Sequence, residues 1–142
     1  MDLYWIVLAI VLGLIFGSFG SVVAHRVPRG ESIGGRERSK CPSCGNVLGA
    51  KENVPLLSFA FQGGRCAHCK ARIPLRYPLA ELATGVLFGL SVWKFDMGLP
   101  AVVYAAFFWV LVVLTVVDLE HHLLPDKIVF PSLVVGLLGL AA

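Results

Sequence analysis

The apolar residues of this chain are gathered into long blocks that are separated by polar stretches. The first block runs from Leu3 to Ala24 without a charged residue, long enough for a helix to cross a hydrocarbon core of roughly 30 Å at about 1.5 Å per residue. Two further blocks occupy residues 78–93 and 99–117, and the polar stretch 94–98 indicates a tight turn between them. Each of the three blocks predicts a transmembrane helix.

A cleavable signal peptide is the alternative interpretation of the first block. The chain begins MDLYW, without a basic region, and the apolar run is longer than the roughly 7 to 15 residues of a signal peptide core. We therefore expect this helix to remain in the mature chain.

A fourth apolar block begins near Ile128 and reaches the last residue, Ala142, before it is long enough for the ~20 residues of a crossing helix. We expect an all-α polytopic membrane protein with about four transmembrane helices, the last of them truncated. The chain would then be a fragment or half of a longer protein. The expected organisation is helix 1 at residues 1–25, a polar loop at 26–77, and helices 2 to 4 at 78–142.

The long polar loop is strongly basic. It carries ten of the twelve Lys and Arg residues against three acids, a net charge of +7. Because Lys and Arg hold short loops on the cytoplasmic side, we expect a cytoplasmic loop and an N-terminus on the outside. The charges are scattered among Gly and Pro and are not interleaved with stacking aromatic residues, so we expect no nucleic-acid partner.

Two CxxC pairs lie inside this loop, Cys41 with Cys44 and Cys66 with Cys69, separated by 21 residues. Two such turns can supply four thiolates to one zinc ion at about 2.3 Å, a closed and therefore structural site. Disulfides or redox thiols are the alternatives, and the reducing cytoplasm disfavours both. The loop has few large apolar residues, so a metal would supply the folding free energy that a core cannot.

Residues within and after each cysteine pair refine this prediction. Gly45 and Lys70 follow the pairs directly and suit the turn that aims backbone N–H groups at sulfur. His68 lies inside the second pair, and with four thiols available we expect it to face solvent rather than the metal.

Among the acidic residues, Asp118 carries the strongest indication of chemistry, because it directly follows an apolar block and ionisable groups at membrane depth are costly. An aspartate that merely reaches the membrane interface remains the alternative. We expect Asp126 to cap the following helix. We expect Glu120 and the two histidines after it to lie in a solvated junction. We expect Glu81 to lie in the first turn of a helix, where the helix dipole favours a carboxylate.

Two further patterns bear on packing and function. Small residues spaced four apart in the first two apolar blocks (Gly13, Gly17 and Ser21; Gly85 and Gly89) predict close helix contacts. The GxGxxG, GxSxG, HExxH and Walker motifs do not occur, which excludes the common nucleotide enzymes and soluble hydrolases.

Five sequence motifs in order resemble those of the type IV prepilin peptidase family over residues 17–131. They are GSFGSVVAHRVPRG, CPSCG, ENVPLLSF, GGRCAHCKARIPLRYPLAELATGVLF and DLEHHLLPD. Members of that family are aspartic proteases of the bacterial cytoplasmic membrane that remove the leader from type IV prepilins and type II secretion pseudopilins. Many also methylate the new N-terminus.

For this chain, the resemblance implies that Asp118 is the first catalytic aspartate. It also implies a zinc-binding cytoplasmic loop, S-adenosylmethionine as methyl donor, and a prepilin or pseudopilin substrate. The family's second aspartate lies in a GxGD motif, whereas this sequence contains no Gly-Asp pair. Gly20 and Ser21 also depart from the family, which commonly has a bulkier residue followed by Asn.

A protease of this class needs two carboxylates that share a proton. We therefore expect an incomplete dyad in this chain, to be completed by a separate C-terminal peptidase half. The alternative is a noncatalytic membrane scaffold whose zinc loop binds pilin leaders or complements such a half.

Overall fold

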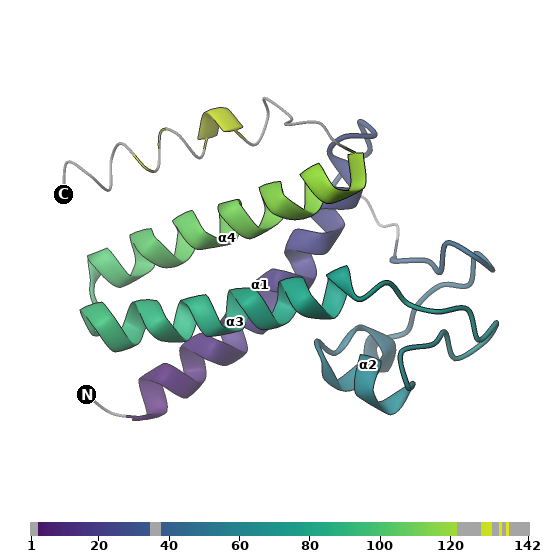
Figure 1. The fold of residues 1–142 in the computed structure, drawn as a ribbon, viewed down its shortest axis with the longest axis horizontal. Helices are drawn as coiled ribbons and strands as arrows, with labels where there is room; N and C mark the ends of the chain where they lie inside the picture. The colour runs from purple at the N-terminus through teal and green to yellow at the C-terminus, as the bar shows by residue number, and fades with distance from the viewer. Residues whose placement is uncertain (1–2, 35–37, 122–128, 132–133, 135, 137–142) are drawn as a thin grey trace.

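The computed structural model of the chain describes residues 3–34, 38–121, 129–131, 134 and 136. Three long helices, α1 (Leu3–Arg26), α3 (Arg76–Phe95) and α4 (Leu99–His121), pack against one another. Figure 1 shows α3 and α4 as an antiparallel hairpin crossed by α1, with the loop between α1 and α3 extending from one end of the bundle. We call this end the loop-side end.

Glycine allows the close approach of α1 to α3. A Cβ atom added at Gly13 would lie 2.7 Å from the Cα of Gly85, and one added at Gly17 would lie 2.6 Å from the Cα of Glu81. Both distances are far below van der Waals contact, so a larger residue would force the helices apart. The predicted packing role of these glycines is confirmed.

Two helices, Leu3–Arg26 and Leu99–Glu120, are long and apolar enough to cross a membrane, judged by length and composition. The helix expected at 78–93 is present as α3, which is less apolar than the other two. The structure therefore confirms a helical arrangement with apolar helices at the first and third blocks. Residues 122–128 are outside the described part of the chain, as is most of the fourth block.

The interior of the bundle at the loop-side end is built from small and β-branched residues. The cluster consists of Val23, Ala24, Ala80, Val113, Val116 and Val117. Beside it, Trp109 lies over Gly20 of α1, and its Nε1–H donates a hydrogen bond to the carbonyl oxygen of Phe16 at 2.8 Å. These contacts pack the C-terminal half of α4 against α1.

The described residues of the loop form two short elements, the 3-10 helix η1 (Ala50–Asn53) and α2 (Leu57–Phe61). Its two β-bridges, Lys40 with Val47 and Arg65 with Arg72, are isolated. Among the described loop residues, the buried apolar side chains are those of Cys41 and Cys66. The expectation that this loop lacks an apolar core of its own is therefore confirmed.

Candidate functional site

The first cysteine pair is held by a tight turn. The N–H of Gly45 donates to the carbonyl oxygen of Cys41 at 2.8 Å, and the N–H of Cys41 donates to the carbonyl oxygen of Asn46 at 2.9 Å. Gly45 has a φ of 70°, in the left-handed region that favours glycine. The turn directs both cysteine side chains to one side, as the sequence predicted.

The second pair repeats this geometry. The N–H of Lys70 donates to the carbonyl oxygen of Cys66 at 3.0 Å, the N–H of Cys66 donates to that of Ala71 at 2.9 Å, and Lys70 has a φ of 60°. Lysine rarely adopts this conformation, so the turn is retained at a conformational cost. Two similar turns therefore face each other across the loop.

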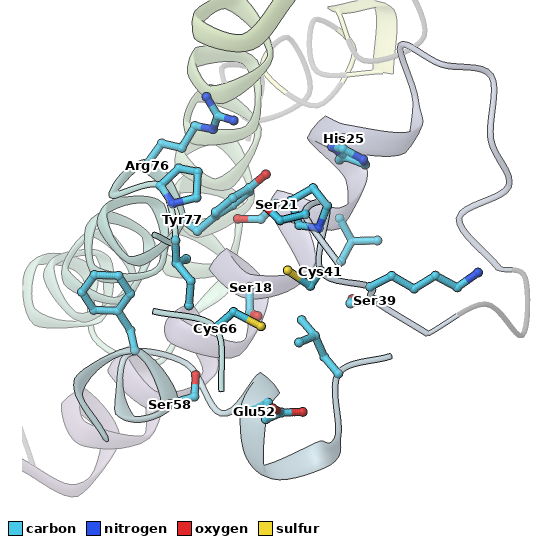
Figure 2. Close-up of a pocket in the computed structure, with 18 of the residues that line it drawn as sticks. Ser18, Ser21, His25, Ser39, Cys41, Glu52, Ser58, Cys66, Arg76 and Tyr77 are labelled. Atoms are coloured by element: carbon cyan, nitrogen blue, oxygen red, sulfur yellow. The ribbon is translucent and has the colours of Figure 1, made fainter. Parts of the chain in front are cut away.

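The sulfur atoms of Cys41, Cys44, Cys66 and Cys69 all lie within 4.8 Å of one another, and those of Cys41 and Cys69 are 3.8 Å apart. Four sulfurs bound tetrahedrally at about 2.3 Å from one zinc ion would be about 3.8 Å apart. The four thiols are free rather than paired as disulfides. The donor set and its spacing thus fit zinc, and Figure 2 shows the sulfurs of Cys41 and Cys66 close together above Glu52.

Backbone dipoles prepare part of this cluster for metal binding. The N–H groups of Cys44 and Ser43 lower the pKa of the Cys41 thiol to about 7, and those of Cys69 and His68 lower the pKa of Cys66. At Cys44 the N–H of Asn46 acts in the same direction, but desolvation and the other three thiols raise its pKa to about 11. A zinc ion would remove this conflict, because its charge stabilises all four thiolates.

His68 stays outside the sulfur cluster, as expected. Its side chain is 55% exposed, and its Nε2 lies 3.7 Å from the Oε1 of Glu52. The other carboxylate oxygen of Glu52 accepts a hydrogen bond from the N–H of Gly49 at 2.7 Å. Glu52 therefore links η1 to the second cysteine turn without joining the ligand set.

We predict that Gly45→Ala weakens zinc binding about fivefold, because a left-handed conformation costs a residue with a Cβ atom about 1 kcal/mol. A Cβ at Gly45 would meet nothing within 4 Å, so the effect is conformational rather than steric. Competition with a chromogenic chelator measures the affinity. Gly34→Ala is the matched control, because Gly34 lies in the same loop, has equally open surroundings and lacks a left-handed φ. Equal affinities for the two variants would contradict the prediction.

A cavity of about 720 Å³ separates the cysteine turns from the loop-side end of the bundle. Its walls combine hydroxyl, guanidinium, carboxylate and aromatic groups, including Ser18, Ser58, Arg72, Tyr77 and Glu81. Figure 2 shows Ser18, Ser21 and Tyr77 around this cavity together with Cys41 and Cys66. A space of this size accommodates a small organic ligand.

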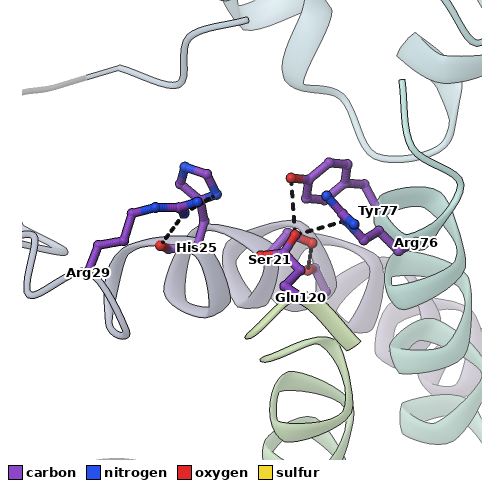
Figure 3. A network of polar contacts seen from close by, with 7 residues as sticks. Ser21, His25, Arg29, Arg76, Tyr77 and Glu120 are labelled. Carbon is purple, nitrogen blue, oxygen red and sulfur yellow. Dashed lines mark hydrogen bonds and ion pairs between the residues drawn. The ribbon is translucent and has the colours of Figure 1, made fainter. Parts of the chain in front are cut away.

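Glu120 lies at the loop-side end of α4, with its side chain only 5% exposed. Its Oε1 accepts a charged hydrogen bond from the Nε of Arg76 at 2.8 Å and another from the hydroxyl of Tyr77 at 3.3 Å (Figure 3). The expectation of a solvated junction is wrong for Glu120. The residue continues the buried face of Val113 and Val117, and an arginine from the start of α3 compensates its charge.

Asp118 is exposed in the last turn of α4. Two residues along a helix correspond to about 200°, so Asp118 lies nearly opposite Glu120. Asp118 lies outside the set of residues that line the cavity. Within the part of the chain that the structure describes, the buried Glu120 therefore does not form a carboxylate pair with Asp118, and Asp126 is outside the described residues.

The expectation that Glu81 occupies the first turn of its helix is wrong. The helix α3 begins at Arg76 rather than at Pro78, so the first turn contains no acidic residue. The Oε2 atom of Glu81 instead accepts a hydrogen bond from the N–H of Leu56 at 2.8 Å. The sequence contains no periodic signal for a contact between residues so far apart.

Comparisons with known proteins agree with the motifs. The model of the bacterial peptidase A24 N-terminal domain matches residues 11–95. A prepilin leader peptidase/N-methyltransferase from Pseudomonas aeruginosa is 37% identical over 96% of this chain and 55% of the relative. The protein of that name from Myxococcus xanthus is 44% identical over 89% of the chain and 38% of the relative. The chain thus spans about half the length of these curated relatives or less, and no solved structure matches it.

Proposed function

Since the chain belongs to the bacterial A24 peptidase family, we propose that it supplies the zinc-loop half of a membrane-bound prepilin leader peptidase and N-methyltransferase. Its substrates would be type IV prepilins or type II secretion pseudopilins in the bacterial inner membrane. The single observation that carries the proposal is the placement of Asp118, exposed at the loop-side end of an apolar helix in a chain of this family.

In the proposed reaction Asp118 is one of two carboxylates that share a proton across the scissile peptide bond. One carboxylate takes a proton from the attacking water, and the other donates a proton to the carbonyl oxygen. The second carboxylate would come from a GxGD segment outside this sequence. The exposure of Asp118 supports a second carboxylate from a separate segment, because such a carboxylate can approach Asp118 directly.

The buried face of α4 would hold Asp118 in place for this chemistry. Val117, directly before Asp118, is fully buried, and Glu120, two residues after it, is bound by Arg76 and Tyr77. Contacts with the bundle therefore hold the last turn of α4 both before and after the aspartate. Asp118 is therefore presented on a rigid helix rather than on a loop, which favours accurate placement of a reacting group.

The zinc site would act structurally in this proposal. A closed set of four thiolates leaves no open position on the metal, and its contribution is folding free energy for the loop. Cys41, Cys44, Cys66 and Cys69 would hold the ion.

For the methyl transfer we propose S-adenosylmethionine as the donor, a substrate bound in the cavity beside the cysteine turns. The support for this location is the size of the cavity and its mixture of aromatic, hydroxyl and charged groups, which can meet an adenine ring, a ribose and a carboxylate.

We also propose that the loop faces the cytoplasm and the N-terminus the outside. A membrane-impermeant maleimide applied to intact cells should then label Met97→Cys, in the exposed turn between α3 and α4, and should not label Ser39→Cys. The unsubstituted chain is the control, because its four cysteines lie in the same loop as Ser39 and should react only after permeabilisation. The reverse labelling pattern would contradict this orientation.

Co-expression tests the proposed division of the active site. We expect the chain alone to leave a prepilin uncleaved, and the chain with a C-terminal family segment carrying GxGD to cleave it, because membrane helices can assemble as separately inserted pieces. Cleavage by the chain alone would contradict the proposal that the second catalytic carboxylate lies on another segment. Capture of the leader without cleavage in either case would support the scaffold function instead.

A further inference from the structure

The short helix α2 has two different faces. Ser58 and Phe59 line the cavity, and the ring of Phe59 lies beside Gly64. Leu57 and Phe61, one helical turn apart, face away from it and are 57% and 87% exposed. The two side chains form an exposed apolar pair on one side of the helix, and the described residues leave this pair uncovered.

A specific contact fixes the position of α2 relative to the membrane helices. The N–H of Leu56, directly before α2, donates to the carboxylate of Glu81 at 2.8 Å. Leu56 has a φ of 57° and a ψ of −43°, a strained γ-turn conformation closed by a hydrogen bond from the N–H of Leu57 to the carbonyl oxygen of Pro55. The beginning of α2 is therefore attached to the side of α3.

The position of Glu81 on α3 indicates how far α2 lies from the loop-side end of the bundle. Glu81 follows the first residue of α3, Arg76, by five positions, which corresponds to about 7.5 Å along the helix axis. Interfacial helices place their apolar face about 5 to 10 Å into the boundary between headgroups and acyl chains. If the loop-side end of the bundle lies at the membrane surface, α2 lies at this boundary.

The surroundings of α2 match a lipid interface in apolarity and in charge. Leu75, Leu79 and Leu82 at the same end of α3 are 65%, 59% and 48% exposed, so the outer surface of the bundle is apolar at this level. On the polar side, Lys51 before α2 and Arg65 after it are both exposed. This combination suits acyl chains beside anionic phosphate groups.

We propose that α2 is an interfacial anchor, with Leu57 and Phe61 inserted among the lipids that surround the bundle. The zinc loop is then held at the membrane at three points, namely its covalent connections to α1 and to α3 and the side chains of α2. This anchoring keeps the cavity at the level of the bilayer surface. The inference depends on the chain residing in a membrane and not on its peptidase activity.

Photo-crosslinking in nanodiscs of phosphatidylethanolamine and phosphatidylglycerol tests the proposal on the zinc-loaded full chain. Benzoylphenylalanine at position 61 should form at least about tenfold more lipid adduct than at Ala67, an exposed position in the second cysteine turn, because a probe inserted among the acyl chains lies against their C–H bonds and a probe in the cysteine turn does not. Mass spectrometry of the intact chain counts the adducts.

Position 57 is the second reporter, because Leu57 lies on the same face of α2 as Phe61. The probe at 57 should also bind lipid, whereas the probe at Phe59 should crosslink to the chain itself near Gly64. Unchanged zinc content shows for each variant that the loop remains folded. Lipid adducts at 57 and 61 no more abundant than at Ala67, or adducts at 61 to another protein only, would overturn the proposal.

Discussion

Replacing Asp118 with asparagine is expected to lower prepilin cleavage by at least about a thousandfold in the chain co-expressed with a GxGD segment, because asparagine cannot exchange the proton that the two carboxylates share. The substitution preserves the size and shape of an exposed side chain, so it should leave the bundle intact. The rate of leader removal from a purified prepilin, in detergent or in membranes, measures the effect.

Two controls separate this chemical role from a general effect of removing an acid. Asp96→Asn changes another exposed aspartate at the opposite end of the α3–α4 hairpin, and it should leave cleavage within about twofold of the unsubstituted chain. Asp126→Asn should also lose much less than Asp118→Asn, because asparagine caps helices as well as aspartate does. If Asp118→Asn and Asp126→Asn abolish cleavage equally in the chain alone, these two residues form the dyad and the missing-partner proposal is wrong.

Cys66→Ser is expected to remove nearly all of the zinc from a chain that otherwise carries about one ion per molecule. Cys66 is buried and its turn has the same hydrogen bonds as that of Cys41, so a weakly coordinating hydroxyl at this position opens the tetrahedron. Structural zinc sites contribute roughly 10 to 16 kcal/mol of apparent binding free energy to small domains. Metal analysis of the purified chain gives the zinc content, and limited proteolysis should show that the loop becomes sensitive.

Ser43→Ala is the matched control for this experiment, because Ser43 lies in the first cysteine turn and is exposed. Its backbone N–H, rather than its hydroxyl, acts on the Cys41 sulfur, so the zinc content should not change. Full zinc content in Cys66→Ser, or none in the unsubstituted chain, would refute the four-thiolate site. Asp118→Asn should keep its zinc, so the two main predictions fail or succeed independently.

The sequence predicted the elements that depend on local composition and spacing. An unbroken apolar run requires a helix in lipid because no water is available for its backbone groups, and α1 and α4 follow from this alone. Cysteines three positions apart lie within one turn, so the sequence also predicted each of the two cysteine pairs of the candidate metal site. The left-handed conformations of Gly45 and Lys70 agree with that prediction.

The errors concern side chains whose environment is supplied by distant residues. Glu120 looked solvated because polar residues surround it in sequence, yet Arg76, 44 positions earlier in the chain, binds it inside the bundle. A helix that started at Pro78 would have placed Glu81 in its first turn, but α3 starts at Arg76 and the carboxylate serves Leu56. Neither partner follows a period of 3.6 residues or a known motif.

By itself, the sequence determined which segments are helical and apolar, which four residues can bind zinc, and which aspartate lies at a helix end. Each of these depends on neighbours within a few turns. Only the tertiary structure decided that the two cysteine turns meet, that Glu120 is buried against Arg76 while Asp118 is exposed, and that α2 is attached one turn inside α3. The physical reason is that each of these contacts joins residues far apart in the sequence, so the packing of the helices and the loop, and not a local pattern, brings them together.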